Sequence, residues 1–500
     1  MDIVLTSNSP GEVAGWLTPA VAGLKQVWPQ ARLTVFLPPC DFASGSEKQV
    51  VERLPGVDEV YGPGQYLRYA LTGQRPAGFA PGREGFVLFA GGDLFHAAWL
   101  GHRLGYPVYA YTEGRAAWLR AIRLWLVPDE ESQRIALIRY HAPAQRVRVV
   151  GRLMVDAVYW ALSTPSGANV HNDTVGWPAA GAGGTDRGRP SAGSWQKTSE
   201  PCRLLLLPGS RPAEFQQMLG LFLGAARELA ALWQEPSSRC WPAGSLQVGM
   251  LLSPFVPPSL LDQTLRTMAE DLAAGRSERW LCPVEGRLRP GRPARQAWQL
   301  ELAGGLTVSV WQPAASGDRY RLMREATVAL GIPGTTTMEM AVLGLPGVIV
   351  LPLQRPDLIP LAGLAGSLGR LPGVGAAIRR LAVVRLAQRA GWLAWPNRLS
   401  GRECLPELRG MVNVPQVVEA LMRLLQEGAE EAAARRECLQ AVAGRPGAAL
   451  RLAQAIAEDW QEQAGVLASH GKGTESIGTG PGDGSYRERR GRPANRRASS

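Results

Sequence analysis

The sequence predicts an α/β fold with two Rossmann-like domains, each built on a doubly wound parallel sheet. Short apolar runs of strand length alternate with amphipathic stretches of helix length, a pattern typical of βαβ units. The alternation stops once, in residues 161–200, where 25 of 40 residues are Gly, Ala, Ser, Thr or Pro, and then resumes. Because a domain takes roughly 150 residues, a chain of 500 residues is long enough for two such halves with full cores.

Residues 1–160 form the first predicted domain. Its expected strands are short apolar runs, at Ile3–Thr6, Leu33–Leu37, Phe86–Ala90, Val108–Tyr111, Leu124–Val127 and Val147–Val150. Amphipathic segments between several of these runs are expected to be helices, at Val13–Val27, Leu94–Leu104 and Glu130–Arg139.

Residues 201–463 form the second predicted domain, joined to the first by a low-complexity linker or insertion at 161–200. Its expected strands are Arg203–Leu207, Gln247–Leu252, Leu306–Val310, Thr327–Leu330 and Val348–Leu351. Residues 283–300 combine arginines with Pro and Gly, which indicates a surface insertion. Residues 464–500 are rich in Gly, Ser and Arg, so we expect a disordered basic tail.

Composition limits the classes of protein to consider. With 45% hydrophobic and 19% charged residues the chain is not wholly disordered, and no run of about 18 apolar residues predicts a membrane-spanning helix. The formal charge is +11, but all except four of the 54 basic residues are arginines, as a GC-rich coding bias would produce. Nucleic-acid binding is not expected, because the basic tail lacks interleaved aromatic residues apart from Tyr486.

The six cysteines show no CxxC spacing, which argues against a zinc site or a disulfide framework and fits a reducing compartment. Asp2 and the absence of a basic flank argue against a secretory signal. We therefore expect a cytoplasmic protein that uses no metal ion and no cofactor. Trp16, Trp99 and Trp118, with arginines around them, are candidates for contact with an anionic membrane surface at the inner face of the cell membrane.

Loops that follow strands are the candidate sites, because ligands of open α/β sheets bind beyond the carboxyl ends of the strands. Gly11 and Glu12 follow the first strand, where a glycine turn and a helix N-terminus can receive an anion or sugar oxygens, although a plain turn explains them equally well. Asp93 follows Gly92 at the end of another strand, and it suits either a general base or a helix cap. Neither loop carries GxGxxG, so a dinucleotide site is not predicted.

Two similar loops lie in the second half. In the first, Gly209–Arg211, capping explains Ser210, but Arg211 opposes the helix dipole unless an anion lies there, and a guanidinium suits a diphosphate. In the second, Gly334–Thr337, three hydroxyls precede a helix that carries Glu339 one turn in, placed to accept from ribose hydroxyls. Capping alone would also explain those hydroxyls.

Taken in order, these segments resemble lipid-A-disaccharide synthase, a family of two-domain GT-B glycosyltransferases that use nucleotide sugars. The matching segments are Gly11-Glu12, Gly92-Asp93, Tyr109–Trp118, Val127–Asp129, Val150-Gly151, Leu207–Arg211, Gly334–Glu339, Pro396–Glu403 and Pro406–Leu408. The resemblance covers most of the chain outside residues 161–200, 283–300 and the tail. It departs in the first loop, where the family's Asp is missing and Trp16 follows Gly15.

The resemblance implies an inverting, metal-independent transfer of a hexosamine-type sugar from a UDP-sugar, across a cleft between the two domains. It implies catalytic roles for Asp93 and Glu12. The UDP-sugar would be bound by Gly209, Ser210, Arg211, Gly334, Thr335, Thr336, Glu339, Asn397 and Glu403, and the acceptor side would carry Gly11, Gly92 and Trp118. The acceptor would be a lipid-linked molecule or another glycan, and the chain would form a homodimer as the family does.

Two alternatives stay open at this point. A UDP-sugar 2-epimerase-like enzyme would use the same nucleotide site and no acceptor. A catalytically inactive glycosyltransferase-like scaffold would bind the nucleotide sugar without turning it over. Because the departures from the family fall in the acceptor half, donor chemistry is better supported than a lipid A acceptor.

Overall fold

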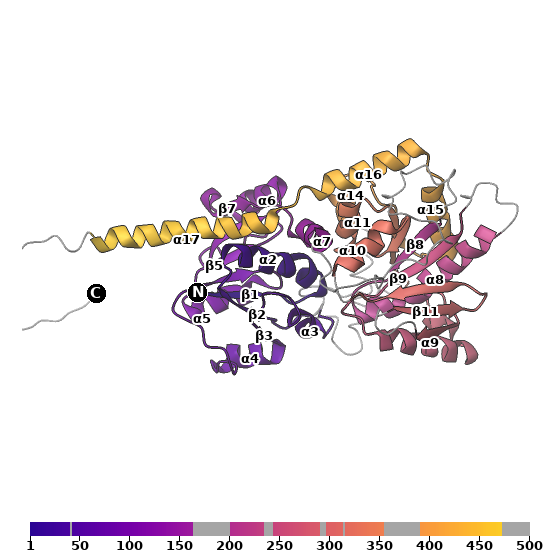
Figure 1. The fold of residues 1–500 in the computed structure, drawn as a ribbon, viewed down its shortest axis with the longest axis horizontal. Coiled ribbons are helices and arrows are strands. Elements are labelled where there is room, and N and C mark those ends of the chain that lie inside the picture. The colour runs from indigo at the N-terminus through magenta and orange to yellow at the C-terminus, as the bar shows by residue number, and fades with distance from the viewer. Residues whose placement is uncertain are drawn as a thin grey trace, which may run out of the picture. The chain divides into compact units, whose positions relative to one another are not determined.

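The computed structural model describes residues 1–40, 43–163, 201–234, 244–290, 297–313, 316–354 and 391–472. It contains two α/β domains with Rossmann-like cores, as the sequence predicts (Figure 1). Both belong to one compact unit, Met1–Ala455, while residues from Ile456 on form a second unit that contains the end of the last helix. The predicted linker lies outside the described residues from 164 on, and so does the predicted tail from 473 on.

The first domain has a seven-stranded sheet in the order β3-β2-β1-β4-β5-β6-β7, parallel throughout. Its strands are β1 (Asp2–Thr6), β2 (Arg32–Phe36), β3 (Glu59–Tyr61), β4 (Gly85–Phe89), β5 (Val108–Tyr111), β6 (Ile122–Val127) and β7 (Val147–Val149). Its helices are α1 (Pro10–Glu12), a π-helical turn (Val13–Leu17), α2 (Thr18–Val27), α3 (Glu47–Val51), α4 (Pro63–Thr72), α5 (Leu94–Leu104), α6 (Glu130–Tyr140) and α7 (Leu153–Ser163), with a 3₁₀ turn at Ala144–Arg146. The sequence did not indicate β3, because three residues that include a glutamate form no apolar run.

The second domain has an eight-stranded sheet in the order β10-β11-β12-β9-β8-β13-β14-β15. Its strands are β8 (Cys202–Leu207), β9 (Leu246–Leu251), β10 (Gly286–Pro290), β11 (Ala297–Leu302), β12 (Thr307–Trp311), β13 (Val328–Gly331), β14 (Gly347–Pro352) and β15 (Glu407–Gly410). Its helices are α8 (Pro212–Gln234), α9 (Pro258–Ala273), α10 (Ser316–Glu325), α11 (Thr336–Leu343), α14 (Trp395–Ser400), α15 (Val414–Gln426) and α16 (Ala429–Ala443), with a 3₁₀ turn at Ser277–Arg279. The segment 283–300, predicted as a surface insertion, contains β10 and most of β11, which extend one edge of the sheet in antiparallel pairing.

The leucine run of β8 shows why the central strands of both sheets have apolar residues at consecutive positions. Leu204 and Leu206 pack into a cluster with Phe215 and Phe222 of α8, whereas Leu205 and Leu207 pack on the opposite face of the sheet. A parallel strand covered by helices on both faces has no solvent side, so all four positions are apolar. The same rule accounts for the uninterrupted burial of β1 and β4.

In each sheet the parallel strand order reverses near the centre, between β1 and β4 and between β8 and β13. Strand β1 pairs with β2 on one side and β4 on the other, and β8 likewise pairs with β9 and β13. Crevices at such points, beyond the carboxyl ends of the strands, are where α/β proteins bind ligands. The predicted candidate loops follow β1, β4, β8 and β13, so all four occupy these two positions.

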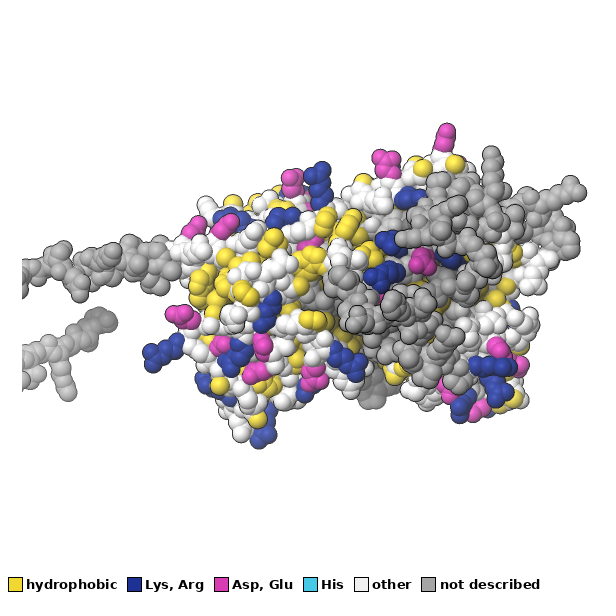
Figure 2. Space-filling model, in the orientation of Figure 1, with side chains coloured by type: hydrophobic (Ala, Val, Ile, Leu, Met, Phe, Trp, Pro, Cys, Tyr) yellow, Lys and Arg dark blue, Asp and Glu magenta, His cyan; other side chains and the backbone are white. Residues whose placement is uncertain are grey.

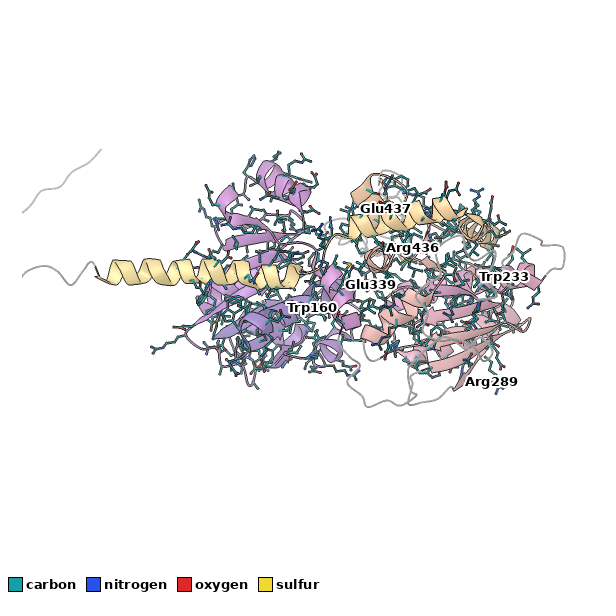
Figure 3. All side chains as sticks on the ribbon, turned by 45° about the horizontal axis from the view of Figure 1, so that its top comes forward. Trp160, Trp233, Arg289, Glu339, Arg436 and Glu437 are labelled. Atoms are coloured by element: carbon teal, nitrogen blue, oxygen red, sulfur yellow. A yellow bond between two sulfur atoms is a disulfide. The ribbon has the colours of Figure 1, made fainter. Side chains whose placement is uncertain are left out.

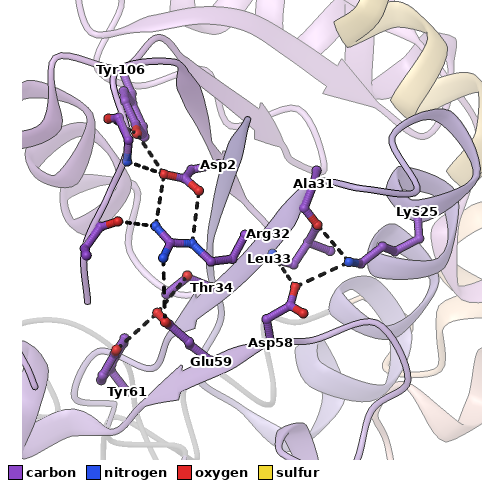
Figure 4. Close-up of polar contacts among 12 residues, drawn as sticks. Asp2, Lys25, Ala31, Arg32, Leu33, Thr34, Asp58, Glu59, Tyr61 and Tyr106 are labelled. Atoms are coloured by element: carbon purple, nitrogen blue, oxygen red, sulfur yellow. Dashed lines mark hydrogen bonds and ion pairs between the residues drawn. The ribbon is translucent and has the colours of Figure 1, made fainter. Parts of the chain in front are cut away.

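The amino ends of the first three strands carry a polar network that holds the sheet together (Figure 4). Arg32 donates to both oxygens of Asp2, from Nε at 3.0 Å and Nη2 at 3.1 Å. Its other Nη lies 3.9 Å from Glu59, which also accepts from the Tyr61 hydroxyl at 3.1 Å. This network is at the opposite end of the strands from the candidate loops, so it fixes the sheet without entering the site.

One expectation from the sequence is wrong. Cys404 and Cys438 form a disulfide, with Cα atoms 6.3 Å apart, although no local cysteine motif indicated it. The pair is 34 residues apart in sequence and is brought together because Cys438 lies on α16 and Cys404 lies between α14 and β15. Spacing rules detect neighbouring cysteines only, so a pair formed by the packing of separate elements escapes them.

Asp156 joins α7 of the first domain to the start of α17 (Ala448–Lys472). The carboxylate is buried and accepts from the backbone N–H groups of Gly447 and Ala449, each at 2.6 Å. The chain therefore returns from the second domain to the first, where Arg451 also donates to the carbonyl of Val150 at 2.7 Å.

We expect Asp156→Ala to lower the free energy of unfolding by about 1–3 kcal/mol, because two buried N–H groups would lose their acceptor. Thermal or denaturant unfolding measures the loss. Asp262→Ala is the matched control, since Asp262 forms a more exposed ion pair with Arg266 along one helix and such pairs contribute little. Equal stability of the two variants would contradict the role given to Asp156.

The described residues show none of the features that would indicate a membrane span or a metal centre. No helix among them combines the length and apolar character that crossing a bilayer requires. They also bring together no group of three or more His, Cys, Asp or Glu side chains that could hold a metal ion. Figure 2 shows basic and acidic side chains interspersed on the face that it presents.

Candidate functional site

The site is centred on Glu12, which follows β1 where the first sheet reverses its strand order. Its carboxylate accepts from the Ser9 hydroxyl at 2.9 Å and from the backbone N–H groups of Ser9 and Gly92. Burial raises the pKa of the Glu12 carboxyl, and the hydrogen bonds and the charge of Arg211 oppose this rise without cancelling it. Glu12 therefore holds a proton more readily than an exposed glutamate.

Two glycines after β4 let that loop pack directly against the loop of Glu12. A Cβ atom on Gly91 would lie 2.7 Å from the Cβ of Glu12, and one on Gly92 would lie 2.7 Å from Nδ2 of Asn8. Both glycines have positive φ, 131° and 95°, which residues with side chains rarely adopt. The pair Gly91-Gly92 is thus required by the close approach of the two loops.

The loops after β8 and β13 form the corresponding part of the second domain. Gly209 has a φ of 116°, and a Cβ atom there would lie 2.9 Å from Cδ1 of Ile332, so these loops also pack together. Arg211 forms an ion pair with Glu214 one turn along. Thr335 is the N-cap residue of α11, and its side chain makes no capping hydrogen bond. Two helix N-termini and a guanidinium therefore lie near one another, which suits an anion.

The two domains meet at these same loops. A Cβ atom on Gly11 would lie 2.8 Å from Cγ2 of Thr335 and 3.2 Å from its hydroxyl oxygen. The charge of Arg211 acts on Glu12 across the same junction. Both strand-order reversals therefore contribute to one site, with the half-buried carboxylate of Glu12 on one side and a cationic, N–H-rich surface on the other.

Glu113 is the candidate that the sequence reasoning missed. Its pKa is raised to about 7, mainly by burial; the charges of Arg152 and Arg398 oppose the rise, and those of Asp129 and Glu12 add to it. Arg398 belongs to α14 of the second domain, so Glu113 also lies near the domain junction. A carboxyl that titrates near neutrality, close to a second carboxyl with a raised pKa, is suited to proton transfer.

The signal that could have found Glu113 is its position. It lies two residues after the buried strand β5, as Asp93 lies four residues after β4. The sequence reasoning gave weight to an acid beside two glycines and treated Glu113 only as part of a matching segment. What distinguishes it is its burial, which no local pattern reports.

Asp93 is a helix cap in this structure, as one of the two sequence interpretations had it. Its carboxylate accepts from the Phe95 N–H at 2.9 Å, lies 3.9 Å from Arg115, and is about half exposed. Trp118 and Phe95, both partly exposed, pack against each other beside it with ring centroids 5.6 Å apart. The acceptor-side residues Gly92 and Trp118 thus lie on adjoining loops, and a base role for Asp93 stays a prediction.

Three predicted donor-site residues are engaged elsewhere in this structure. Glu339 is buried and accepts from Arg319 at 2.8 Å and from the Tyr320 hydroxyl at 3.3 Å (Figure 3 labels it on α11). Asn397 is fully buried, accepts from the N–H groups of Cys404 and Leu405, and donates to the Leu405 carbonyl and to Glu407. Glu403 is exposed. Ribose or uracil contacts by these side chains would require them to exchange partners, and their roles stay predictions.

The remaining predicted donor residues lie on the two loops themselves. Gly334 has a φ of 153° and no atom near the position of a Cβ, and Ser210 and Thr336 are partly exposed at the helix starts. Thr337, which was not predicted, donates to the Gly334 carbonyl at 2.7 Å and accepts from the Trp395 N–H at 3.1 Å. Thr337 therefore fixes the turn that presents Thr335 and Thr336.

Comparison with known proteins identifies similar solved structures but no family. No protein-family model matches the sequence, and a search of curated proteins finds no match. The chain is similar to a Listeria monocytogenes protein described as a UDP-N-acetylglucosamine 2-epimerase (TM-score 0.48, 11% identity, 92% of this chain and 97% of that one). It is also similar to UDP-GlcNAc 2-epimerase from Neisseria meningitidis bound to UDP-GlcNAc (TM-score 0.44, 12% identity, 92% of this chain and 100% of that one). A third similar structure is Acinetobacter baumannii MurG (TM-score 0.38, 13% identity, 91% of this chain and 99% of that one).

At these identities the likeness concerns the arrangement of helices and strands and does not extend to function. Two Rossmann-like domains are established by the strand order and pairing described above. The sequence resemblance to the lipid-A-disaccharide synthase family remains a prediction, and the function has to be argued from the site.

Proposed function

We propose that this chain is a nucleotide-sugar enzyme, and that it transfers a hexosamine-type sugar from a UDP-sugar to an acceptor hydroxyl. The observation that carries the proposal is the junction of the two strand-order reversals. Gly11 contacts Thr335 there, and Glu12 lies within the electrostatic influence of Arg211. The site therefore has separate regions for a leaving anion and for proton transfer.

The donor side would be the second domain. Arg211 and the N-terminal N–H groups of α8 and α11 would bind the diphosphate, with the hydroxyls of Thr335 and Thr336 beside it. Negative charge develops on the diphosphate as the bond to the anomeric carbon breaks, so preorganised positive charge there accelerates the reaction. Because Arg211 would supply that charge, the transfer needs no catalytic metal.

The acceptor side would be the first domain. A carboxylate takes the proton of the acceptor hydroxyl, the hydroxyl oxygen attacks the anomeric carbon, and UDP leaves from the opposite face with inversion. Glu113 and Glu12 are the best placed bases, because burial raises the pKa of each and keeps Glu113 close to the operating pH. Asp93, exposed at the start of α5, would assist or bind the acceptor.

A specific observation favours a second candidate, a UDP-sugar 2-epimerase-like reaction. Glu12 and Glu113 are two carboxyls with raised pKa values in one region, and the charge of Glu12 raises the pKa of Glu113 across the loops after β1 and β5. Such a pair can remove the proton from one face of a sugar carbon and return a proton to the opposite face of the same carbon, without any acceptor. The nucleotide-binding residues would be the same.

Calorimetry with UDP and a panel of UDP-sugars, followed by product analysis, tests the proposal. We expect micromolar binding of UDP with one preferred sugar. Release of free UDP with a joined product supports transfer, and an altered sugar still attached to UDP supports epimerisation. Binding without either product would identify an inactive scaffold, and absence of binding would refute the nucleotide-sugar assignment.

The acceptor, the membrane and the oligomeric state belong to the same proposal. A lipid-linked or glycan acceptor fits the exposed aromatic pair Phe95 and Trp118, which lies next to Asp93. The same pair would rest at an anionic membrane surface if the acceptor is lipid-linked. Sedimentation of the protein with anionic vesicles tests membrane contact, and light scattering tests the homodimer.

Two substitutions of Asp93 separate its proposed chemistry from its cap. Asparagine also caps helices, so Asp93→Asn should keep the unfolding free energy and the UDP affinity while reducing turnover by about 100-fold or more. Asp93→Ala should in addition lose about 1 kcal/mol of stability with the cap. Full activity of Asp93→Asn, measured by UDP release, would leave Asp93 with the cap alone.

A further inference from the structure

Unpartnered buried oxygens gather at the strand-order reversal of the first sheet. Four side-chain oxygens there have no hydrogen-bond partner within the described ranges of the chain, and each belongs to a residue that is more than nine-tenths buried. They are Thr6 Oγ1, Ser7 Oγ, Asn8 Oδ1 and Thr112 Oγ1. Leaving a buried oxygen unpaired costs stability, so four in one region need an explanation.

The four oxygens lie at the carboxyl ends of two strands, β1 and β5, that are separated by one other strand. Thr6 ends β1, Ser7 and Asn8 follow it, and Thr112 follows β5, continuing its pairing through an N–H bond to the Leu126 carbonyl at 3.0 Å. Strand β4 lies between β1 and β5. At the usual strand spacing, β1 and β5 are about 10 Å apart, a distance that a pyranose ring with its hydroxyls can bridge.

The backbone at Thr6, Ser7 and Thr112 is hydrogen-bonded to neighbouring strands, so their oxygens are not the result of a frayed loop. The Ser7 N–H donates to the Phe36 carbonyl at 3.3 Å, and the Ala90 N–H donates to the Thr6 carbonyl at 2.9 Å. Asn8 is held against Gly92, where a side chain would collide with its amide. A rigid main chain thus presents side-chain oxygens whose own bonding capacity is unused.

The surrounding charges decide which ligand suits these oxygens. Glu12 and Glu113 lie on the two loops that carry these oxygens, and Asp93 lies on the loop after β4 between them. Arg115 lies 3.9 Å from Asp93, and the charges of Arg152 and Arg398 act on Glu113. Carboxylates accept hydrogen bonds and repel anions, so a phosphate is disfavoured here, in contrast to the site of Arg211. Hydroxyl, amide and carboxylate groups beside the aromatic rings of Phe95 and Trp118 suit a sugar, which has hydroxyls at its edge and an apolar face.

We propose that Thr6, Ser7, Asn8 and Thr112 form a subsite for a neutral sugar ring with free neighbouring hydroxyls and no anionic group at the bound end. The oxygens are shielded from solvent, so binding includes a separation of the loops after β1 and β4. The ring would be either the acceptor or the sugar moiety of the donor. This inference rests on the proposed function, since it names the sugar chemistry of that site.

Saturation-transfer NMR on the full chain tests the subsite with defined probes. Methyl glucoside and methyl N-acetylglucosaminide should show saturation transfer, and glucose 1-phosphate should show at least tenfold less. Inorganic phosphate, which has no carbon-bound proton to observe, is added as a competitor and should not reduce the glycoside signals. Displacement of the glycoside by a UDP-sugar but not by UDP would identify the donor's ring. Retention in the presence of the UDP-sugar, with tighter binding of octyl glycosides, would identify a lipid-linked acceptor.

The variant Thr112→Val separates a ligand role from a structural one. We expect it to abolish saturation transfer to the glycosides while keeping or raising the melting temperature, because an unpaired buried oxygen is removed. Thr34→Val is the matched control: Thr34 is a buried threonine on β2 whose hydroxyl donates to Glu59 at 3.3 Å, so its loss should lower the melting temperature and leave the glycoside signals unchanged.

Two results would overturn the subsite. One is unchanged saturation transfer in Thr112→Val, and the other is a drop in melting temperature equal to that of Thr34→Val, which would mean that the Thr112 hydroxyl has a structural partner. Calorimetry with UDP on the same samples keeps the proposals apart. UDP binding without glycoside binding would refute the subsite alone, whereas loss of UDP binding in the unmodified protein would refute the proposed function.

Discussion

Replacing Glu113 by glutamine is expected to reduce turnover by about 100- to 10,000-fold, the range typical of a lost general base. Glutamine keeps the size of the side chain but cannot take the proton from the hydroxyl of the acceptor substrate. The unmodified enzyme should become faster as pH rises towards about 7, where the half-buried carboxyl of Glu113 ionises, and then level off. The variant's residual activity should lack that pH dependence. Initial rates of UDP release between pH 5 and pH 9 measure both effects.

Unfolding experiments give an independent check on Glu113. Because its folded-state pKa is raised to about 7 from 4.5, the group favours folding below its unfolded pKa, and this contribution is lost as pH rises through about 7. Glu113→Gln should therefore gain stability relative to the unmodified protein between pH 5 and pH 8, by up to about 3 kcal/mol. Glu131→Gln, at an exposed glutamate of α6, is the control and should show no such gain.

A constant stability difference across that pH range would mean that Glu113 is not a buried group with a raised pKa. If turnover fell but its pH dependence stayed unchanged, Glu113 would position the substrate and another carboxyl would be the base. Glu12→Gln would then be the next variant, because burial also raises the pKa of Glu12.

Replacing Arg211 by alanine is expected to weaken UDP binding by about 10- to 100-fold. Hydrogen bonds between charged groups contribute about 1.5–3 kcal/mol each, and every 1.4 kcal/mol is a factor of ten in affinity. Arg211→Lys should bind UDP with intermediate affinity, because lysine keeps the positive charge but cannot make the bidentate hydrogen bonds of a guanidinium to the diphosphate. Calorimetric titration with UDP measures each dissociation constant.

The ion-pair partner of Arg211, Glu214, has to be included when the UDP affinity of Arg211→Ala is interpreted. In Arg211→Ala the carboxylate of Glu214 would lose its cation and repel the diphosphate, so part of the loss would be indirect. The double variant Arg211→Ala with Glu214→Gln isolates the missing guanidinium. Arg266→Ala, an exposed arginine on α9, is the control. UDP affinity that is unchanged in the double variant would remove Arg211 from the diphosphate site.

The parts of the site that the sequence predicted share one property, which is a local pattern. Gly11, Gly92, Gly209 and the turn before Thr335 stand directly after apolar strands, and the strand order places all four loops at the two reversals. Glycine at these positions indicates that the backbone approaches another segment closely. One residue and its neighbours in the sequence are enough to predict that constraint. The position of Arg211 was equally clear, because a cation at a helix start is unfavourable without an anion.

The residues whose role the structure changes depend on distant partners. Glu339 and Asn397 have the right residue types for nucleotide contacts, yet Arg319 and the Leu405 backbone engage them in this structure. The hydrogen-bond partner that each of these side chains finds depends on the packing of α10 against α11 and of α14 against β15. No local sequence pattern contains that information. The same applies to the disulfide between Cys404 and Cys438.

The sequence by itself determined two domains with mainly parallel sheets, most of their central strands and the loops that carry the candidate site. It could do so because burial on both faces of a strand leaves an apolar run, and a ligand-facing turn leaves glycines and hydroxyls. Only the tertiary structure decided which carboxyls hold protons, how the loops of the two domains meet, and which buried oxygens lack partners. Those properties depend on burial and on charges far away in the chain, as the titration of Glu113 between Asp129, Arg152 and Arg398 illustrates.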